Sequence, residues 1–196
     1  NDIIAYLMFI IMPTSTTEPA LAKRACAVIA PTTACPACAT AYQQCCLPLH
    51  QGTAIASTPQ ALMRSRYSAY VLGLYDYIVA TYASAERANL TVYDIANSAA
   101  QTTWIGLRVL DTKILPQSTN DVGQFYGEVE FKVFYSEAKC LYCLHERSTF
   151  VQEDGQWFYR DGVMLAGNGA VKSKRNDPCC CGSSKKFKQC CLPKIQ

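Results

Sequence analysis

Cysteine is the residue type in this chain whose number and spacing point most clearly to chemistry, with twelve in 196 residues. Four cysteines fall within residues 35–46 and five within residues 179–191. Four thiolates complete the tetrahedral shell of a zinc ion, whereas a disulfide framework usually spreads its cysteines through a small secreted domain. The grouping therefore predicts two local metal sites, one on each side of the body of the chain.

The second group has the sharper ligand spacing. Residues 176–193 read NDPCCCGSSKKFKQCCLP, which places a C-x-C-x8-C-C pattern on Cys179, Cys181, Cys190 and Cys191. A knuckle of this size has no core of its own, so a bound zinc ion would supply its folding energy. The alternative is a set of disulfides or free buried thiols, and the two adjacent cysteines argue against disulfides, because neighbours rarely pair.

The loop between these ligands is basic. It contains Lys185, Lys186, Phe187 and Lys188, with the phenylalanine as a small apolar lid. Residues 172–196 hold seven Lys or Arg and one Asp, whereas the remainder holds eleven basic and fourteen acidic residues. The loop is suited to contact an acidic protein face or RNA phosphates, or it only offsets the negative charge of a four-thiolate metal centre. The net charge of +3 excludes a strongly basic nucleic-acid binder by bulk charge.

A weaker copy of the same module precedes the body. The segment YQQCCLP at residues 42–48 matches FKQCCLP at residues 187–193. Its four cysteines, in a C-x2-C-x6-C-C pattern, are Cys35, Cys38, Cys45 and Cys46. The copy has no Gly-Ser pair and none of the lysines, so it predicts either a second zinc site or a degenerate copy that keeps its fold by packing.

The C-terminal segment RNDPC-x-CGS-x-KKFK-x-CC resembles the SEC-C motif, the zinc-binding tail first named for the preprotein translocase ATPase SecA. The usual proline between the first two ligands is Cys180 here, and the usual second glycine is Ser184. In SecA the similar tail docks onto the chaperone SecB and onto ribosomes. The resemblance therefore implies a zinc-binding adaptor that meets a chaperone, translocation or ribosomal partner through the lysines and Phe187.

The resemblance extends to a whole family. The segments LMRSRYSAY (62–70), TTWIGLRVL (102–110), HERSTFVQEDGQWFYRDG (145–162) and RNDPC (175–179) together resemble the YchJ-like family of uncharacterised bacterial proteins. That family has a SEC-C motif at each end of a domain similar to nuclear transport factor two. The resemblance implies a degenerate SEC-C-like knuckle over residues 31–50, a central domain over 55–168 and a SEC-C knuckle over 172–196. Residues 1–30 lie outside the resemblance and are expected to form an N-terminal extension.

The pattern of the central residues predicts the same fold class, α+β. Thr58-Pro59 marks a helix start, helical spacing of apolar residues continues to residue 82 with Gly73 as a break, and a second helix begins at Thr91. Strand patterns follow at residues 104–115, 124–135, 141–152 and 157–161, with hairpin turns at 120–123 and 153–155. Helices packed on a curved antiparallel sheet make a cone with a potential pocket.

The candidate pocket residues are Arg64, Arg66, Trp104 and Glu146. Alternation along strand 141–152 turns Glu146 towards the cone and His145 away, so these two cannot act as an acid/base pair. The alternative is a structural ion pair between Glu146 and one of the arginines. The sequence has no nucleophile motif, phosphate loop or catalytic carboxylate pair, which favours a non-enzymatic adaptor over a pocket that binds or converts a small molecule.

The remaining features concern the compartment. Residues 3–12 are all apolar, but ten helical residues rise only about 15 Å, half of a bilayer core. Metal-binding thiols must stay reduced, so the sequence predicts a cytoplasmic protein with no membrane association. Cys26, Cys140 and Cys143 lie outside the ligand patterns and are predicted to be small buried hydrophobes.

Overall fold

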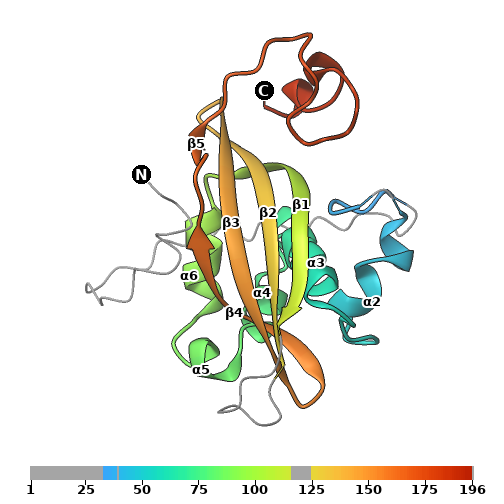
Figure 1. Cartoon of the computed structure of the whole chain (residues 1–196), viewed down its shortest axis with the longest axis vertical. Coiled ribbons are helices and arrows are strands. Elements are labelled where there is room, and N and C mark those ends of the chain that lie inside the picture. The colour runs from blue at the N-terminus through green and yellow to red at the C-terminus, as the bar shows by residue number, and fades with distance from the viewer. Residues whose placement is uncertain (1–32, 39, 116–124, 196) are drawn as a thin grey trace.

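The computed structural model describes residues 33–38, 40–115 and 125–195. The extension over residues 1–30, its apolar segment 3–12, Cys26 and the turn at 120–123 lie outside the described residues. What is described is a central α+β domain with a small cysteine-rich segment at either end (Figure 1).

The helices begin and end at the residues that capping chemistry indicates. Helix α3 (Pro59–Leu72) is capped by the Thr58 hydroxyl, which accepts the Ala61 N–H, and it stops at Gly73 in the left-handed conformation (φ 72°). Helices α4 (Tyr75–Ala80), α5 (Ser84–Arg87) and α6 (Val92–Ala99) follow, the last capped by Thr91. The predicted start at Thr58, break at Gly73 and start at Thr91 are confirmed.

The strands form an antiparallel sheet in the order β1-β2-β3-β4. Their bounds are β1 Thr103–Leu115, β2 Tyr126–Glu137, β3 Cys140–Glu153 and β4 Gln156–Met164, and a short β5 (Gly169–Ala170) pairs with β3. Asp154 and Gly155, both at positive φ, close the β3–β4 hairpin, as left-handed two-residue turns do. The predicted fold class, helices on a curved antiparallel sheet, is confirmed.

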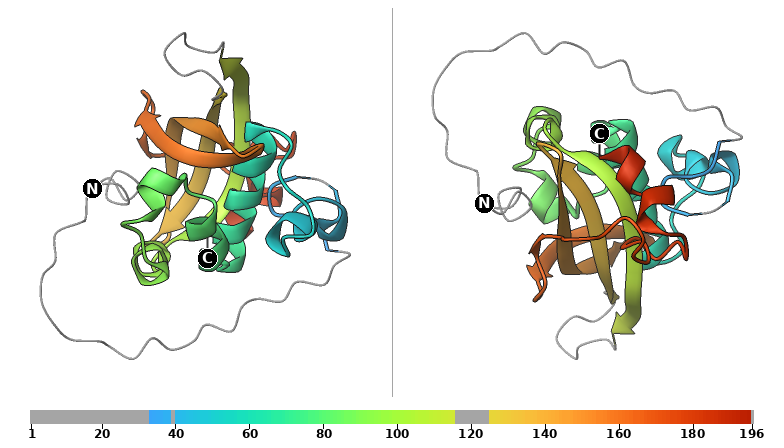
Figure 2. Two further views of the ribbon diagram at one scale, coloured as in Figure 1. Left: turned by 90° about the horizontal axis from the view of Figure 1, so that it is seen from below. Right: turned by 90° about the horizontal axis from the view of Figure 1, so that it is seen from above.

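Helix α3 packs across β1, β2 and β4 on the concave face of the sheet (Figure 2). Alternation along β3 decides which side chains enter the core: Glu146, Ser148 and Phe150 are buried beneath the helices. His145 and Arg147 point to the other face, so the predicted separation of His145 from Glu146 is confirmed.

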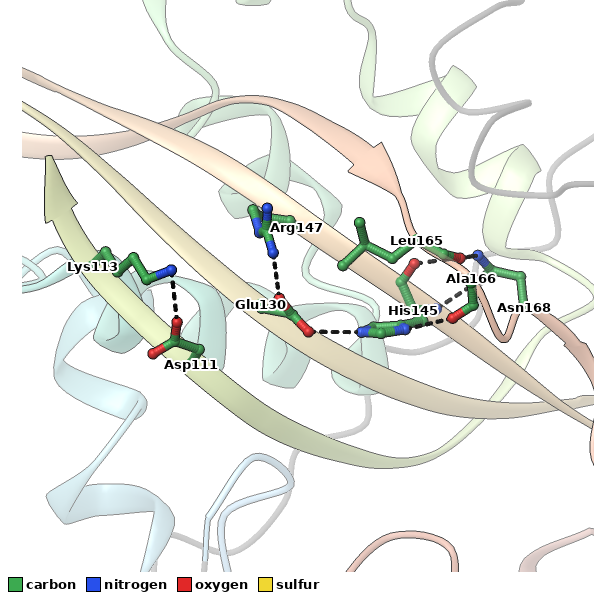
Figure 3. Close-up of polar contacts among 8 residues, drawn as sticks. All are labelled: Asp111, Lys113, Glu130, His145, Arg147, Leu165, Ala166 and Asn168. Atoms are coloured by element: carbon green, nitrogen blue, oxygen red, sulfur yellow. Dashed lines mark hydrogen bonds and ion pairs between the residues drawn. The ribbon is translucent and has the colours of Figure 1, made fainter.

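A polar clamp occupies the outer face of the sheet (Figure 3). Arg147 donates to Glu130 Oε2 (2.8 Å), and His145 Nε2 lies 3.0 Å from Glu130 Oε1. His145 Nδ1 donates to the Ala166 carbonyl (2.7 Å). The Asn168 side chain accepts a hydrogen bond from the His145 N–H and donates one to the His145 carbonyl. The hydrogen bonds from Arg147 and His145 lower the pKa of Glu130. The clamp fixes the turn after β4, from which the chain runs to the second cysteine cluster.

One glycine on β4 allows the buried carboxylate to fit. A Cβ added to Gly162 would overlap the Glu146 side chain. In the strand register Gly162 pairs with Ser148, which lies two residues from Glu146 on the same face of β3. We expect Gly162→Ala to lower the free energy of unfolding by about 2 kcal/mol, the usual range for overpacking a filled site. Thermal or urea unfolding measures the change. The exposed neighbour Val163→Ala is the control and should change stability by less than about 0.5 kcal/mol. Equal stability of the two variants would contradict the close approach.

Candidate metal centres

The C-terminal cluster brings four sulfur atoms to one point. The thiols of Cys179, Cys181, Cys190 and Cys191 all lie within 4.8 Å of one another. Successive pairs along this set are 3.5, 3.5 and 3.9 Å apart. A tetrahedron with metal–sulfur bonds of about 2.3 Å has edges of about 3.8 Å, so the donor set fits a tetrahedral metal ion. Cys180 lies outside the group of four.

Local backbone geometry builds this arrangement. The Cys179 N–H bonds the Lys185 carbonyl (2.8 Å), and the Gly182 N–H bonds the Cys179 carbonyl (3.0 Å). Gly182 (φ 78°) and Ser184 (φ 61°) are left-handed. The short helix η2 (Phe187–Gln189) then returns the chain to the last two ligands. Ser184 stands where the SEC-C motif usually has a second glycine, and its φ shows why glycine suits that position.

The C-terminal knuckle is packed onto the outer face of the sheet. Phe187, Cys179 and Cys191 form one buried cluster with sheet residues. The sheet contributes Ile105, Phe134, Leu141 and Cys143. A Cβ added to Gly106 would lie 2.9 Å from Cys181 Cβ, so the knuckle backbone approaches β1 closely, as Figure 2 also shows. We name these seven residues the docking cluster.

The docking cluster corrects two predictions. Phe187 is only 4% exposed, so it cannot serve as a partner-contact residue: its ring anchors the knuckle to the sheet. Lys185, Lys186 and Lys188, on either side of it, are exposed. Cys143 is buried in the docking cluster as predicted, but Cys140 is exposed, because it begins β3 at the hairpin with β2.

The N-terminal cluster is a tighter group of three with a fourth thiol beside it. Cys35, Cys45 and Cys46 lie within 4.8 Å of one another, with Cys35–Cys46 at 3.3 Å and Cys45–Cys46 at 3.6 Å. Cys38 lies 2.9 Å from Cys45 but is not within 4.8 Å of all three. Three thiols are thus placed as ligands, and the fourth is adjacent.

This second knuckle is packed against helix α3 (Figure 2). Its helices are η1 (Tyr42–Gln44) and α2 (Leu47–His50). The Ser68 hydroxyl lies 3.4 Å from the Cys35 sulfur and 3.5 Å from the Cys46 sulfur. The His50 ring bridges the Tyr42 hydroxyl (2.6 Å) and the Ser65 carbonyl (2.9 Å). Both knuckles are therefore held against the central domain by buried contacts.

Arg64 belongs to this contact and not to the cone. Its Nη1 donates to the Ala37 carbonyl at 2.7 Å, and it does not line the cavity beneath the sheet. Arg66, Trp104 and Glu146 do line that cavity, whose volume is about 70 Å³. Residues two apart on a helix do not share a face, so Arg64 and Arg66 cannot both enter the cone. The prediction of Arg64 as a pocket residue is wrong for this reason.

In each cluster, hydrogen bonds from neighbouring groups lower the pKa of one thiol. The hydrogen bond from Cys46 lowers the pKa of Cys35 to about 4, while the pKa of Cys46 itself is raised. Burial works against ionisation of Cys179, but hydrogen bonds from the Cys181 backbone and from neighbouring thiols bring its pKa to about 6. Because metals bind the thiolate form, both clusters present a ready ligand at neutral pH.

Comparison with known proteins agrees with this architecture. A family model described as the YchJ middle NTF2-like domain matches residues 58–162, and the SEC-C motif model matches residues 175–193. The chain belongs to the YchJ-like family. Among relatives, the UPF0225 protein VP1145 of Vibrio parahaemolyticus is 42% identical over 161 residues, which cover 76% of this chain and 92% of the relative. A UPF0225 protein of Shewanella sp. strain ANA-3 is 40% identical over 155 residues, covering 77% and 90%.

Two solved structures are similar to this chain in fold. A SEC-C motif containing protein from Rhodopseudomonas palustris gives a TM-score of 0.58 at 32% identity, covering 65% of this chain and 94% of its own. A SEC-C motif containing protein from Psychrobacter arcticus gives a TM-score of 0.57 at 32% identity, covering 82% and 96%. SEC-C is a metal-binding motif, and the donor geometry of both clusters fits a metal ion. None of the helices in the described residues is long and apolar enough to cross a membrane.

The ligand assignment distinguishes two adjacent cysteines. We expect Cys179→Ala to lose one metal ion per chain, because it removes a member of the group of four. Cys180→Ala should retain the full metal content, because the neighbouring thiol is outside that group. Elemental analysis of protein purified without added metal measures both. Metal loss in Cys180→Ala with retention in Cys179→Ala would show that the neighbour is the ligand.

The docking cluster predicts that the free energy of unfolding of the domain and the metal retention of the knuckle both depend on the contact between them. We expect Phe187→Ala to cost about 3–5 kcal/mol, the usual range for truncating a buried phenylalanine, and to weaken metal retention against a chelator. Lys186→Ala, one position earlier and exposed, is the matched control and should leave both unchanged. Chemical denaturation and competition with a chromogenic chelator give the two readouts. A Phe187→Ala chain as stable as the control would mean that the knuckle does not depend on the sheet.

Proposed function

We propose that this protein is a cytoplasmic zinc-binding adaptor that docks onto a partner through its C-terminal SEC-C knuckle. Zinc is the metal that suits the site, because four thiolates in a tetrahedron leave no open position for substrate or water. Such closed sites are structural. The metal would hold the shape of the knuckle, and the docking would be done by the side chains around it.

The observation that carries this proposal is the alternation of burial in the loop between the ligands. Lys185, Lys186 and Lys188 are exposed, while Phe187 among them is buried in the docking cluster. The buried ring fixes the loop to the sheet, so the three ammonium groups are presented from a rigid base. A preorganised charged surface loses less entropy on binding than a mobile tail does.

The charge around the knuckle indicates the partner's chemistry. Lys172, Lys174 and Arg175 are also exposed in the segment that enters the knuckle. A four-thiolate zinc centre offsets only part of this positive charge. An acidic protein face is the complement that fits a compact patch of this kind. By resemblance to the SecA tail, the partner would be a chaperone, a translocation component or a ribosomal protein.

The lysines provide the direct test. We expect the triple variant Lys185→Ala, Lys186→Ala and Lys188→Ala to lose at least about tenfold in affinity for a purified SecB-type chaperone or for ribosomes, with its zinc content unchanged. The control variant replaces the exposed Lys113 and Lys139, which lie on the sheet and its hairpin, and should bind as the wild type does. Pull-down followed by titration measures the affinity.

Three outcomes would contradict the proposal. Binding that is unchanged in the triple variant would show that the lysines only offset the charge of the metal centre. Equal loss in the control variant would show a non-specific charge effect. A steep fall of affinity with salt on naked RNA, with no binding to the protein partners, would assign the patch to phosphates, because phosphate binding releases counterions.

A further inference from the structure

The central domain contains a cavity that the metal centres do not use. It lies between helix α3 and the concave face of the sheet, has a volume of about 70 Å³, and is walled mainly by aromatic rings. Of the residues that line it, Tyr70 and Trp104 are half-buried and the others are buried, and the ring centroids of these two are 5.2 Å apart. These two rings are therefore the most exposed part of its wall.

A carboxylate in the wall has one oxygen without a protein donor. Glu146 is 3% exposed. The Ser148 hydroxyl (2.6 Å) and the Tyr159 hydroxyl (3.3 Å) both donate to Oε1. Within the described part of the chain, no group donates a hydrogen bond to Oε2. Oε2 is not among the buried side-chain atoms of the described residues that lack a partner, so it borders open space and not packed protein.

A guanidinium in the same wall has free donors. Arg66 is 4% exposed, and its Nη1 donates to the Ile78 carbonyl (2.8 Å) and the Thr81 hydroxyl (2.6 Å). The Tyr82 and Tyr159 rings flank its Cζ, with centroids at 4.5 and 4.6 Å. Among residues 33–38, 40–115 and 125–195, no acceptor is placed on Nε or Nη2. The aromatic rings hold the cation in position without using these N–H groups.

The two charges line one cavity without meeting. Arg66 and Glu146 form no ion pair within 4.0 Å in the described residues, although opposite charges buried this deeply usually pair directly. The wall of the cavity therefore contains an acceptor and donors that no described residue satisfies. A ligand that matches both must donate to Glu146 and accept from Arg66. It should be neutral, because the two charges in the wall already balance.

Size narrows the ligand class. An apolar cavity of about 150 Å³ holds benzene, so a cavity of half that volume holds about three or four non-hydrogen atoms. We propose that the cavity binds a primary amide group, which donates an N–H to Glu146 Oε2 and accepts a hydrogen bond at its carbonyl from Arg66. The rest of a larger ligand would leave past Tyr70 and Trp104. This site is separate from the exposed lysines that are proposed to bind a partner, and its test does not depend on them.

Three probes of nearly equal shape test this class. Acetamide offers one donor and one acceptor side, acetate offers acceptors only, and acetamidinium offers donors only. The zinc-loaded full chain is titrated with each at about pH 8, because burial raises the pKa of Glu146 and the carboxylate must be ionised. The indole N–H signal of Trp104 in NMR spectra reports binding. Trp157 lines a different groove and serves as the internal control.

We expect acetamide to shift the Trp104 signal with a millimolar Kd and to bind about tenfold more tightly than either ion. Glu146→Gln turns the acceptor at this position into an amide donor, so the preference should switch from acetamide to acetate. Arg66→Met should abolish acetamide binding. The triple lysine variant should bind acetamide as the wild type does, which separates this site from the docking surface.

The proposal is overturned if no probe shifts Trp104, since the cavity then holds only water. It is equally overturned if all three probes bind with the same affinity, since the cavity then does not recognise the amide. It is also overturned if acetate or acetamidinium binds the wild type most tightly. If Arg66→Met does not fold, the Glu146→Gln switch still decides the matter, because that substitution is isosteric and removes a buried charge. Unchanged preference in folded Glu146→Gln excludes Glu146 as the recognising group.

Discussion

Both knuckles lack a core and must obtain one from the central domain. The C-terminal knuckle buries Phe187 on the sheet, and the N-terminal knuckle sets the Cys35 and Cys46 thiols against Ser68 of helix α3. Metal ligation orders a few residues around four sulfur atoms, but it does not orient the knuckle relative to the rest of the chain. The apolar and hydrogen-bonded contacts do so. Because Phe187 is buried on the sheet, the lysines beside it remain on the surface. Because Arg64 donates to the Ala37 carbonyl of the N-terminal knuckle, it stays out of the cone.

The sheet serves two environments because successive residues point to opposite faces. On β1, Trp104 points to the cavity and the adjacent Ile105 joins the docking cluster. On β3, Cys143 faces the knuckle and Leu144 faces the cavity. A shift of one residue in strand register would exchange these sets, so the register fixes the metal knuckle and the cavity together. The two candidate sites are separated by the thickness of a single sheet.

Local chemistry in the sequence predicted much of this architecture. Thr58, Gly73 and Thr91 set helix ends through capping and backbone freedom, and the alternation along residues 145–150 assigned faces correctly. The ligand spacing also selected the four cysteines that the structure brings together at the C-terminal end. These features depend on residues near one another in the chain, which is why a single sequence reveals them.

What the sequence did not reveal depends on contacts between distant segments. The burial of Phe187 requires Ile105 and Phe134, and the role of Arg64 requires Ala37. Gly162 gave no signal in a strand pattern, although its missing side chain accommodates Glu146. Tyr159 reaches the cavity from β4 and was not among the predicted pocket residues. Periodicity shows which face a residue occupies, but not which distant element covers that face.

The docking cluster also has a consequence for biosynthesis. Ile105, Phe134, Leu141 and Cys143 are translated before the knuckle that covers them. A nascent chain whose sheet has formed therefore carries an uncovered apolar patch until residues 179–191 emerge and are ordered. Uncovered apolar surface of this kind makes partly folded chains prone to aggregate. The segment that seals the sheet is thus synthesised after the strands that it covers.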